Sequence, residues 1–177
     1  LLKVRSRDNL VSIAYVNLVG GQDELVFDGN SFFVNPSGEI LAKGKSFEED
    51  LIVADIDLDE IFRYQLRDNR LKNLRSEYKR SENVKFIKLD YQIKEKTVNI
   101  EQKIILDKSD VENTYNALVL GLRDYITKNG FKKVVIGLSG GVDSSLVATI
   151  AVDALGSENV KGVLMPSPYT SKESIED

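Results

Sequence analysis

The clearest pattern of hydrophobic positions along the chain lies between residues 133 and 165. An apolar run from Val134 to Leu138 precedes a turn of small residues, and a second apolar run extends from Val160 to Met165. Between the two runs, apolar residues recur on one face of a helix, at Leu146, Val147, Ile150, Ala151, Ala154 and Leu155. The spacing predicts a strand, a loop, a helix that begins at Ser144 and ends at Gly156, and a second strand, together the size of one βαβ unit.

The first sixty residues show mostly strand-like patterns. Val11 to Val19 is apolar on both faces, which predicts a buried strand. Residues 20–31 combine glycines with acids, and we interpret them as a structured loop rather than a strand. Residues 32–43 predict a hairpin around the turn Pro36-Ser37-Gly38, and residues 51–58 alternate as a further strand.

Residues 59–108 form a polar connection with many basic residues and only a loose helical spacing. We interpret its charges as a solvated face, with phosphate binding as the less favoured alternative. Two segments, 86–93 and 97–105, are expected to be extended. A helix then begins after Ser109, which can cap it together with Glu112, and ends at Gly130. Its expected apolar face consists of Val111, Tyr115, Leu118, Leu122 and Ile126.

The loop between the strand at Val134 and its helix carries the candidate chemistry. Gly140 and Gly141 lack a Cβ, so the backbone can turn sharply and a ligand can approach closely. The free amides and the dipole of a helix N-terminus favour an anion. Hydroxyl donors are added by Ser139, Ser144 and Ser145. Asp143 has the wrong charge for phosphate, which indicates that it holds a Mg²⁺ ion shared with the phosphates. The alternative is a Gly-Ser turn without a ligand.

The spelling of this loop excludes two common phosphate sites. A Walker A loop requires a second Gly where Val142 stands and a Lys that the turn lacks, and the dinucleotide fingerprint has a different spacing. The remaining pattern, S-G-G-x-D-S-S after a strand, resembles the PP-loop ATP pyrophosphatases, which split ATP into AMP and pyrophosphate. The resemblance implies that ATP binds at Gly137, Leu138, Ser139, Gly140, Gly141, Val142, Asp143, Ser144, Ser145 and Met165, with Asp143 as the metal ligand.

Composition narrows the possible classes of protein. The formal net charge of −4 argues against a nucleic-acid-binding surface. The sequence has no Cys and no His, which excludes a disulfide scaffold, Ser-His-Asp catalysis and the usual zinc sites within this chain. No apolar run is long enough to span a membrane, and no signal peptide is visible, so we expect a cytoplasmic protein. The chain begins with Leu and stops in an apparent helix start, so we expect a segment of a larger protein.

The upstream part of the chain resembles the C-terminal part of a nitrilase-type glutaminase domain. The resemblance lies in the run N-L-V-G-G-Q-D-E-L-V-F-D-G-N-S, the predicted hairpin and the run F-E-E-D-L. Together with the PP-loop and the tail G-V-L-M-P-S-P-Y-T-S, this order resembles the family of glutamine-dependent NAD⁺ synthetases. The resemblance implies an α/β chain in which the end of a nitrilase-like α/β sandwich, residues 1–65, is followed by a connection, 66–108. The first βαβ unit of a Rossmann-like, parallel-sheet PP-loop synthetase domain would then occupy residues 109–177.

The resemblance also implies a reaction. Members of this family adenylate deamido-NAD⁺ with ATP and Mg²⁺, and ammonia released from glutamine displaces AMP to give NAD⁺. The glutaminase nucleophile is a Cys assisted by Glu and Lys, and all three would lie upstream of this segment, so the segment alone is expected to be inactive. A second acidic Mg²⁺ ligand and much of the deamido-NAD⁺ site would lie downstream. We expect a homo-oligomer. The alternatives are another PP-loop amidotransferase, such as GMP synthetase, and a nucleotide-binding module without catalysis.

Overall fold

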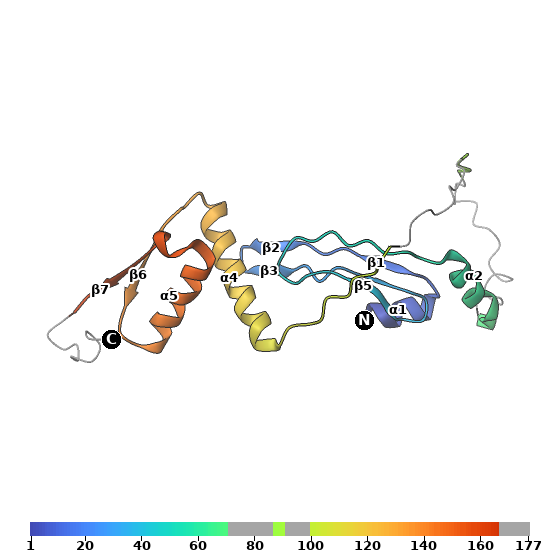
Figure 1. Cartoon of the computed structure of the whole chain (residues 1–177), viewed down its shortest axis with the longest axis horizontal. Helices are drawn as coiled ribbons and strands as arrows, with labels where there is room; N and C mark the ends of the chain where they lie inside the picture. Colours follow the sequence, from blue (N-terminus) through green and yellow to red (C-terminus); the bar gives the residue numbers. More distant parts are fainter. Residues whose placement is uncertain (71–86, 91–99, 167–177) are drawn as a thin grey trace. The chain divides into compact units, whose positions relative to one another are not determined.

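The computed structural model describes residues 1–70, 87–90 and 100–166 (Figure 1). These residues form two compact units that alternate along the chain. The first unit comprises Leu1–Val16, Ser31–Gly44 and Leu51–Ile105, and the second comprises Asn17–Asn30, Lys45–Asp50 and Leu106–Asp177. Predictions for the basic run after residue 70, for parts of both extended segments and for the tail after residue 166 lie outside the described residues.

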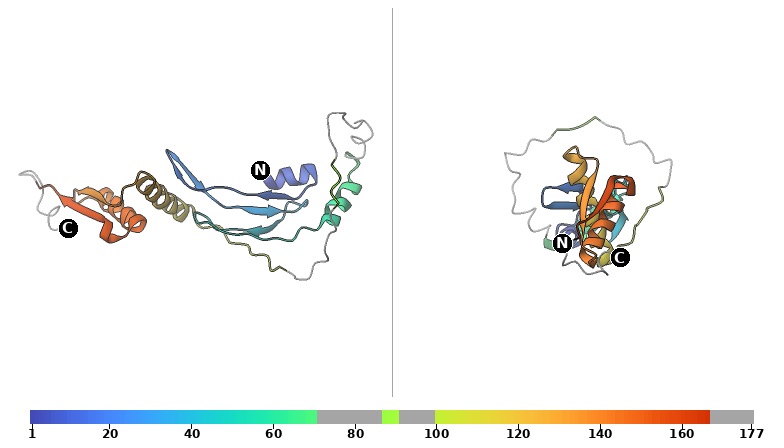
Figure 2. Two further views of the ribbon diagram at one scale, coloured as in Figure 1. Left: turned by 90° about the horizontal axis from the view of Figure 1, so that it is seen from above. Right: turned by 90° about the vertical axis from the view of Figure 1, so that its left-hand side faces the viewer.

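The first unit is built on a three-stranded antiparallel sheet in the order β1-β4-β5. Its strands are β1 (Ile13–Tyr15), β4 (Phe32–Val34) and β5 (Ile40–Lys43). Helix α1 (Leu2–Asn9) lies along β4 (Figure 2). It is anchored by Ser6, whose hydroxyl donates to the carbonyl of Asn35. The hairpin predicted for residues 32–43 is therefore confirmed. In its turn, the Asn35 Oδ1 atom accepts hydrogen bonds from the amides of Ser37 and Glu39.

Two predictions for the first unit are wrong, and one of its helices was not predicted. The chain opens with helix α1, which the polar sequence did not indicate, and the strand expected over Val11 to Val19 shrinks to β1, with Ala14 and Val16 exposed. Residues 51–58 have the alternating sequence of a strand, but no described strand pairs with them. They lead instead into α2 (Leu58–Arg67), because the Asp57 carboxylate caps that helix by accepting from the amides of Asp59 and Glu60.

The second unit begins with a hairpin where we predicted a structured loop. Strands β2 (Val19–Gln22) and β3 (Leu25–Asp28) pair antiparallel around the residues Asp23 and Glu24. Asp23 takes the left-handed conformation with a φ of 50°, which Asp tolerates better than most residues. The adjacent glycines in β2 would normally weaken a strand. Helix α4 (Asp110–Lys128) packs across them, which explains why the hairpin forms.

Helix α4 follows the predicted boundaries closely. The Ser109 hydroxyl accepts a hydrogen bond from the Glu112 amide and caps the helix, and Gly130 lies just beyond its end with a φ of 79°. The predicted apolar face is only partly right, because Leu120 and Ile126 are buried whereas Val111 is 81% exposed. The helix contacts both the β2–β3 hairpin and α5, so a single stripe does not describe its packing.

The predicted βαβ unit is confirmed. Strands β6 (Val134–Leu138) and β7 (Val160–Leu164) pair in parallel, from Val134 with Val160 to Leu138 with Leu164. Between them lie α5 (Val142–Leu155) and the short 3₁₀ helix η1 (Ser157–Asn159). Helix α5 begins two residues before the expected Ser144, and it buries Ile150 and Ala151. The α/β class is thus confirmed, and none of the helices in the described ranges has the length and apolarity to cross a bilayer.

Candidate functional site

The loop from Ser139 to Gly141 joins the carboxyl end of β6 to the first turn of α5. Gly140 has a φ of 75°, so the turn uses a conformation that favours glycine. Gly141 is the N-cap residue of α5, and no side chain caps the helix. The first amide that the helix itself satisfies is that of Ser145, which donates to the Gly141 carbonyl at 3.2 Å. The preceding amides of α5 therefore point out of the helix end without an intrahelical acceptor, as an anion requires.

The serines of the loop hold its shape through their own hydroxyl groups. The Ser144 hydroxyl donates to the Gly141 carbonyl at 2.9 Å, and its oxygen lies 3.3 Å from the Ser139 amide nitrogen, which donates to it. The Ser145 hydroxyl bonds the same carbonyl at 3.1 Å. Ser139 Oγ in turn accepts from the Gly141 amide at 3.4 Å. The loop is thus a closed turn before any ligand is considered.

Asp143 lies in the first turn of α5 and is exposed to solvent. Within the described ranges, no group of three or more His, Cys, Asp or Glu residues is placed to hold a metal ion. Asp143 can therefore supply one carboxylate to a cation, and the other ligands would have to come from a bound phosphate, from water or from elsewhere in the protein. This arrangement fits Mg²⁺, which usually takes only one or two carboxylates and keeps water and phosphate oxygens as its other ligands.

The end of β7 lies beside the same loop. Gly137 pairs with Val163, and a Cβ at Gly137 would lie 3.0 Å from the Met165 Cε atom, so the Met165 side chain covers this glycine. Met165 is 72% exposed and Leu164 is 53% exposed. The structure therefore brings all ten predicted ATP-binding residues to the carboxyl edge of the parallel pair and the adjoining helix start. Open parallel sheets bind their ligands at this edge.

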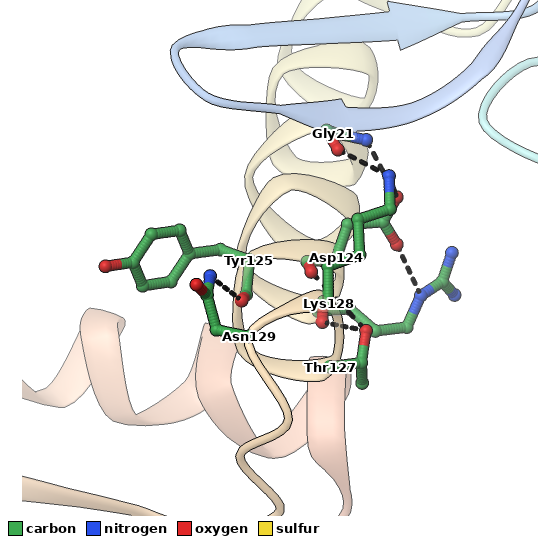
Figure 3. A network of polar contacts seen from close by, with 7 residues as sticks. Gly21, Asp124, Tyr125, Thr127, Lys128 and Asn129 are labelled. Atoms are coloured by element: carbon green, nitrogen blue, oxygen red, sulfur yellow. Dashed lines mark hydrogen bonds and ion pairs between the residues drawn. The ribbon is translucent and has the colours of Figure 1, made fainter.

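The structure also contains a polar cluster that sequence reasoning missed. On α4, Asp124 and Lys128 bind both polar groups of the Gly21 backbone in β2 (Figure 3). The Gly21 amide donates to Asp124 Oδ2 at 2.8 Å, and Lys128 Nζ donates to the Gly21 carbonyl at 2.6 Å. The two side chains also form an ion pair at 3.1 Å. An Asp and a Lys four residues apart on a helix were visible in the sequence, but nothing there indicated their backbone partner.

The electrostatics of this cluster favour the ionised Asp124. Burial raises the pKa of its carboxyl, but the Gly21 amide, Lys128 and then Arg123 more than offset that effect and hold the pKa below its ordinary value. Beside the cluster lies a cavity of about 270 Å³ between the hairpin and α4. Its lining includes Asp23, Tyr125 and Asn129. Tyr125 is 61% exposed, so it does not belong to the core.

Two protein families match different parts of the chain. Residues 1–65 match the carbon–nitrogen hydrolase family, and residues 114–177 match the NAD synthase family. The β2–β3 hairpin therefore lies in the first match, whereas most of α4 and the loop from Ser139 to Gly141 lie in the second.

Individual relatives match almost the entire chain. It is 53% identical to a glutamine-dependent NAD(+) synthetase of Thermotoga maritima and 52% identical to one of Aquifex aeolicus, in each case over 99% of the chain. The chain spans 30% of the length of each of these relatives. A solved structure of the glutamine-dependent NAD+ synthetase of Acinetobacter baumannii with ADP is 36% identical and has a TM-score of 0.68, over 99% of this chain and 26% of that one.

Proposed function

We propose, given that the chain belongs to the family of glutamine-dependent NAD(+) synthetases, that the full-length protein amidates deamido-NAD⁺ to NAD⁺. The reaction would use ATP to adenylate deamido-NAD⁺, and ammonia from glutamine would then displace AMP. The observation that supports the proposal most directly is the uncapped start of α5 after a left-handed Gly140, in the segment that matches NAD synthases.

Within this proposal, the loop binds the phosphates of ATP. The amides at the start of α5 donate to the phosphate oxygens, and the absence of side chains at Gly140 and Gly141 lets the phosphates approach the backbone. Asp143 would hold a Mg²⁺ ion, and the chemistry that this ion would supply is the neutralisation of phosphate charge. Leu164 and Met165, exposed beside the loop, are the proposed neighbours of the adenine, in keeping with the ADP-bound relative.

Glutamine hydrolysis requires a nucleophile that this chain does not contain, since the sequence has no Cys. We therefore propose that residues 1–65 form part of the ammonia-producing domain without its nucleophile. Residues 66–108 would be the connection, and residues 109–177 would begin the synthetase domain. The isolated segment is proposed to bind nucleotide without turnover. A homo-oligomer and a cytoplasmic location belong to the same proposal, by analogy with the family.

The test is to supply the purified full-length protein with ATP, Mg²⁺ and ammonia, and to offer deamido-NAD⁺ or xanthosine monophosphate as acceptor. NAD⁺, AMP and pyrophosphate should form in equal amounts from deamido-NAD⁺ only. Formation of GMP would favour the other PP-loop amidotransferase that the sequence left open. Binding of ATP without any AMP would favour a nucleotide-binding module.

A further inference from the structure

The Gly21 cluster joins two segments that match different protein families. Gly21 lies in the part that matches carbon–nitrogen hydrolases, and Asp124 and Lys128 lie in the part that matches NAD synthases. All three nevertheless belong to one compact unit. The contact connects residues 107 positions apart in the sequence, and it uses charged side chains on backbone groups. Such hydrogen bonds are stronger than those between neutral groups.

The hairpin and α4 pack closely at this contact, with no room for side chains at the glycines. A Cβ at Gly21 would lie 3.1 Å from the Cα of Gly121 and 3.3 Å from the Cβ of Asp124. A Cβ at Gly121 would lie 3.2 Å from a methyl group of Val26, on the other strand of the hairpin. Backbone therefore meets backbone where β2 crosses α4. This closeness is what allows the short side chain of Asp124 to reach the Gly21 amide.

The same cluster explains how β2 tolerates two glycines. Gly21 pairs with Val26 across the hairpin, and its amide and carbonyl are both used by one turn of α4, where a third strand would otherwise bind. Gly20 adds to the fit, because a Cβ there would lie 3.0 Å from Asp124 Oδ2. The residue at 124 is mostly buried, with a side-chain exposure of 15%. Asp124 thus faces the hairpin and Lys128, with Arg123 at 3.7 Å on its outer side.

Helix α4 continues the connection toward the loop from Ser139 to Gly141, which is the proposed phosphate loop. It packs against α5, and the Tyr115 hydroxyl donates to Asp153 of α5 at 2.5 Å. The N-terminus of α5 is the proposed ATP site. One helix therefore holds the hairpin on one side and the helix that begins at the phosphate loop on the other.

We propose that Asp124 and Lys128 are positioning residues that fix the β2–β3 hairpin on α4, and that this fixation couples glutamine-derived ammonia to NAD⁺ synthesis. The inference rests on the function proposed above. Neither residue touches the phosphate loop, so free ammonia should be used normally when the fixation is lost. Ammonia that must come from the glutaminase should be used poorly, because the β2–β3 hairpin is no longer fixed on α4.

The experiment compares Asp124→Ala and Lys128→Met with Glu112→Ala in the full-length protein. Glu112 lies on the same helix and pairs at 3.4 Å with Lys108, which stands just before the helix begins. Glu112 is exposed, which makes its variant a matched control. For each variant, the rates of NAD⁺ formation from glutamine and from ammonia are measured, together with the NAD⁺ formed per glutamate released. The expected result is a loss of about tenfold in the glutamine-dependent rate, with the ammonia-dependent rate within about twofold of the wild type, given the loss of a charged hydrogen bond. The yield of NAD⁺ per glutamate should fall, and Lys128→Arg should restore part of it.

A second measurement addresses the contact itself. Hydrogen exchange at the Gly21 amide should be slow in the wild type and in Glu112→Ala, and fast in Asp124→Ala, in preparations that retain their ammonia-dependent activity. An unchanged ratio of the two rates, or an equal loss of both, would overturn the coupling role while leaving the proposed function intact. A wild-type protein that makes no NAD⁺ from either nitrogen source would overturn the proposed function, and the coupling role with it.

Discussion

Ser139 and Ser144 bring their hydroxyl oxygens to 3.1 Å from each other across the loop that begins α5. Ser144 also donates to the Gly141 carbonyl and accepts from the Ser139 amide, so it closes the loop at both ends. Among the described residues, the hydroxyl of Ser145 makes a single hydrogen bond, back to the Gly141 carbonyl, as serines in helices often do. The Ser144 hydroxyl therefore closes the loop, whereas the Ser145 hydroxyl only bonds the first turn of the helix, and the loop is closed without a ligand.

The first prediction follows from this difference. Ser144→Ala should weaken ATP binding roughly two- to tenfold, corresponding to about 0.5–1.5 kcal/mol for a lost hydrogen bond. Ser145→Ala is the control and should change ATP affinity less. Calorimetric titration of both variants with a non-hydrolysable ATP analogue gives the comparison. Equal affinities for the two variants would show that loop closure by Ser144 does not matter for the nucleotide.

The second prediction concerns the proposed metal ligand. Asp143→Asn keeps the size of the side chain and removes the charge that would hold Mg²⁺. Glutamine-dependent and ammonia-dependent NAD⁺ formation should fall together, by at least the roughly 10- to 100-fold loss that is typical when a hydrogen-bond partner of a metal ligand is removed. Titration with Mg²⁺ at fixed ATP should show a raised requirement for the metal. A fall in the glutamine-dependent rate alone would contradict the role assigned to Asp143.

The third prediction separates the two loop glycines. Val at either position should abolish nucleotide binding and leave the fold intact, but for different reasons. Gly140 has a φ of 75°, so any side chain there strains the backbone by about 1–3 kcal/mol. Gly141 has an ordinary φ of −96°, and a Cβ there would meet only the Ser139 hydroxyl at 3.3 Å. Val at this position would instead act by filling the space in which a phosphate must approach the backbone.

Alanine variants make this distinction measurable. Gly140→Ala should lower the free energy of unfolding, whereas Gly141→Ala should affect it little, as denaturant titration can show. Both Val variants should fail to bind ATP in the same titration experiment as above. An unchanged ATP affinity in Gly141→Val would remove the case for a phosphate site at this loop.

The fourth prediction is a pH dependence of stability that comes from Asp124. The pKa of its carboxyl is lowered in the folded protein, so it contributes stability that is fully present above its unfolded pKa of about 3.9 and is lost as pH falls through the folded value. The groups that face it are the Gly21 amide, Lys128 and Arg123. Asp124→Asn should therefore be less stable than the wild type at neutral pH, and the difference should shrink below pH about 4. Thermal unfolding at several pH values would reveal it, and a constant difference would exclude this origin.

The sequence was most informative where local chemistry decides the structure. The strand ending at Leu138, the Gly-rich turn, the cap at Ser109 and the hairpin around Pro36 all follow from neighbouring residues, and all are present in the structure. The loop from Ser139 to Gly141, the proposed phosphate site, is of this kind, because its amides and hydroxyls are supplied by consecutive residues. Its residues were therefore predictable, although their binding of ATP stays a prediction.

Contacts between distant segments could not be foreseen in the same way. The glycines at 20 and 21 indicated a loop, because nothing nearby in the sequence shows that α4 completes the bonding of β2. Residues 51–58 alternate as a strand does, but a strand requires a neighbour, and the described residues provide none. The apolar face of α4 was misjudged for the same reason, since that helix packs on two elements.

The last prediction concerns the tip of the β2–β3 hairpin. Asp23 and Glu24 are exposed there, and Asp23 lines the cavity beside the Gly21 cluster. Their negative charges make them unsuitable for ATP phosphates. We expect removal of both side chains, by Asp23→Ala with Glu24→Ala, to impair NAD⁺ formation from glutamine and largely spare formation from added ammonia, because the hairpin lies in the segment that matches the carbon–nitrogen hydrolases.

The structure shows why a second variant is needed for this experiment. Asp23 has a φ of 50°, which Ala tolerates less well than Asp or Asn, so the double alanine variant changes both the charge and the turn. Asp23→Asn with Glu24→Gln removes the charges and keeps the turn. If charge is what matters, both variants should lose glutamine-dependent activity to a similar extent, measured beside the ammonia-dependent rate on the same folded preparation. If only the alanine variant is impaired, the shape of the hairpin is what the glutaminase requires. An equal loss from both nitrogen sources would mean that the hairpin serves the synthetase or the fold, and the assignment of residues 1–65 to ammonia production would lose its functional support.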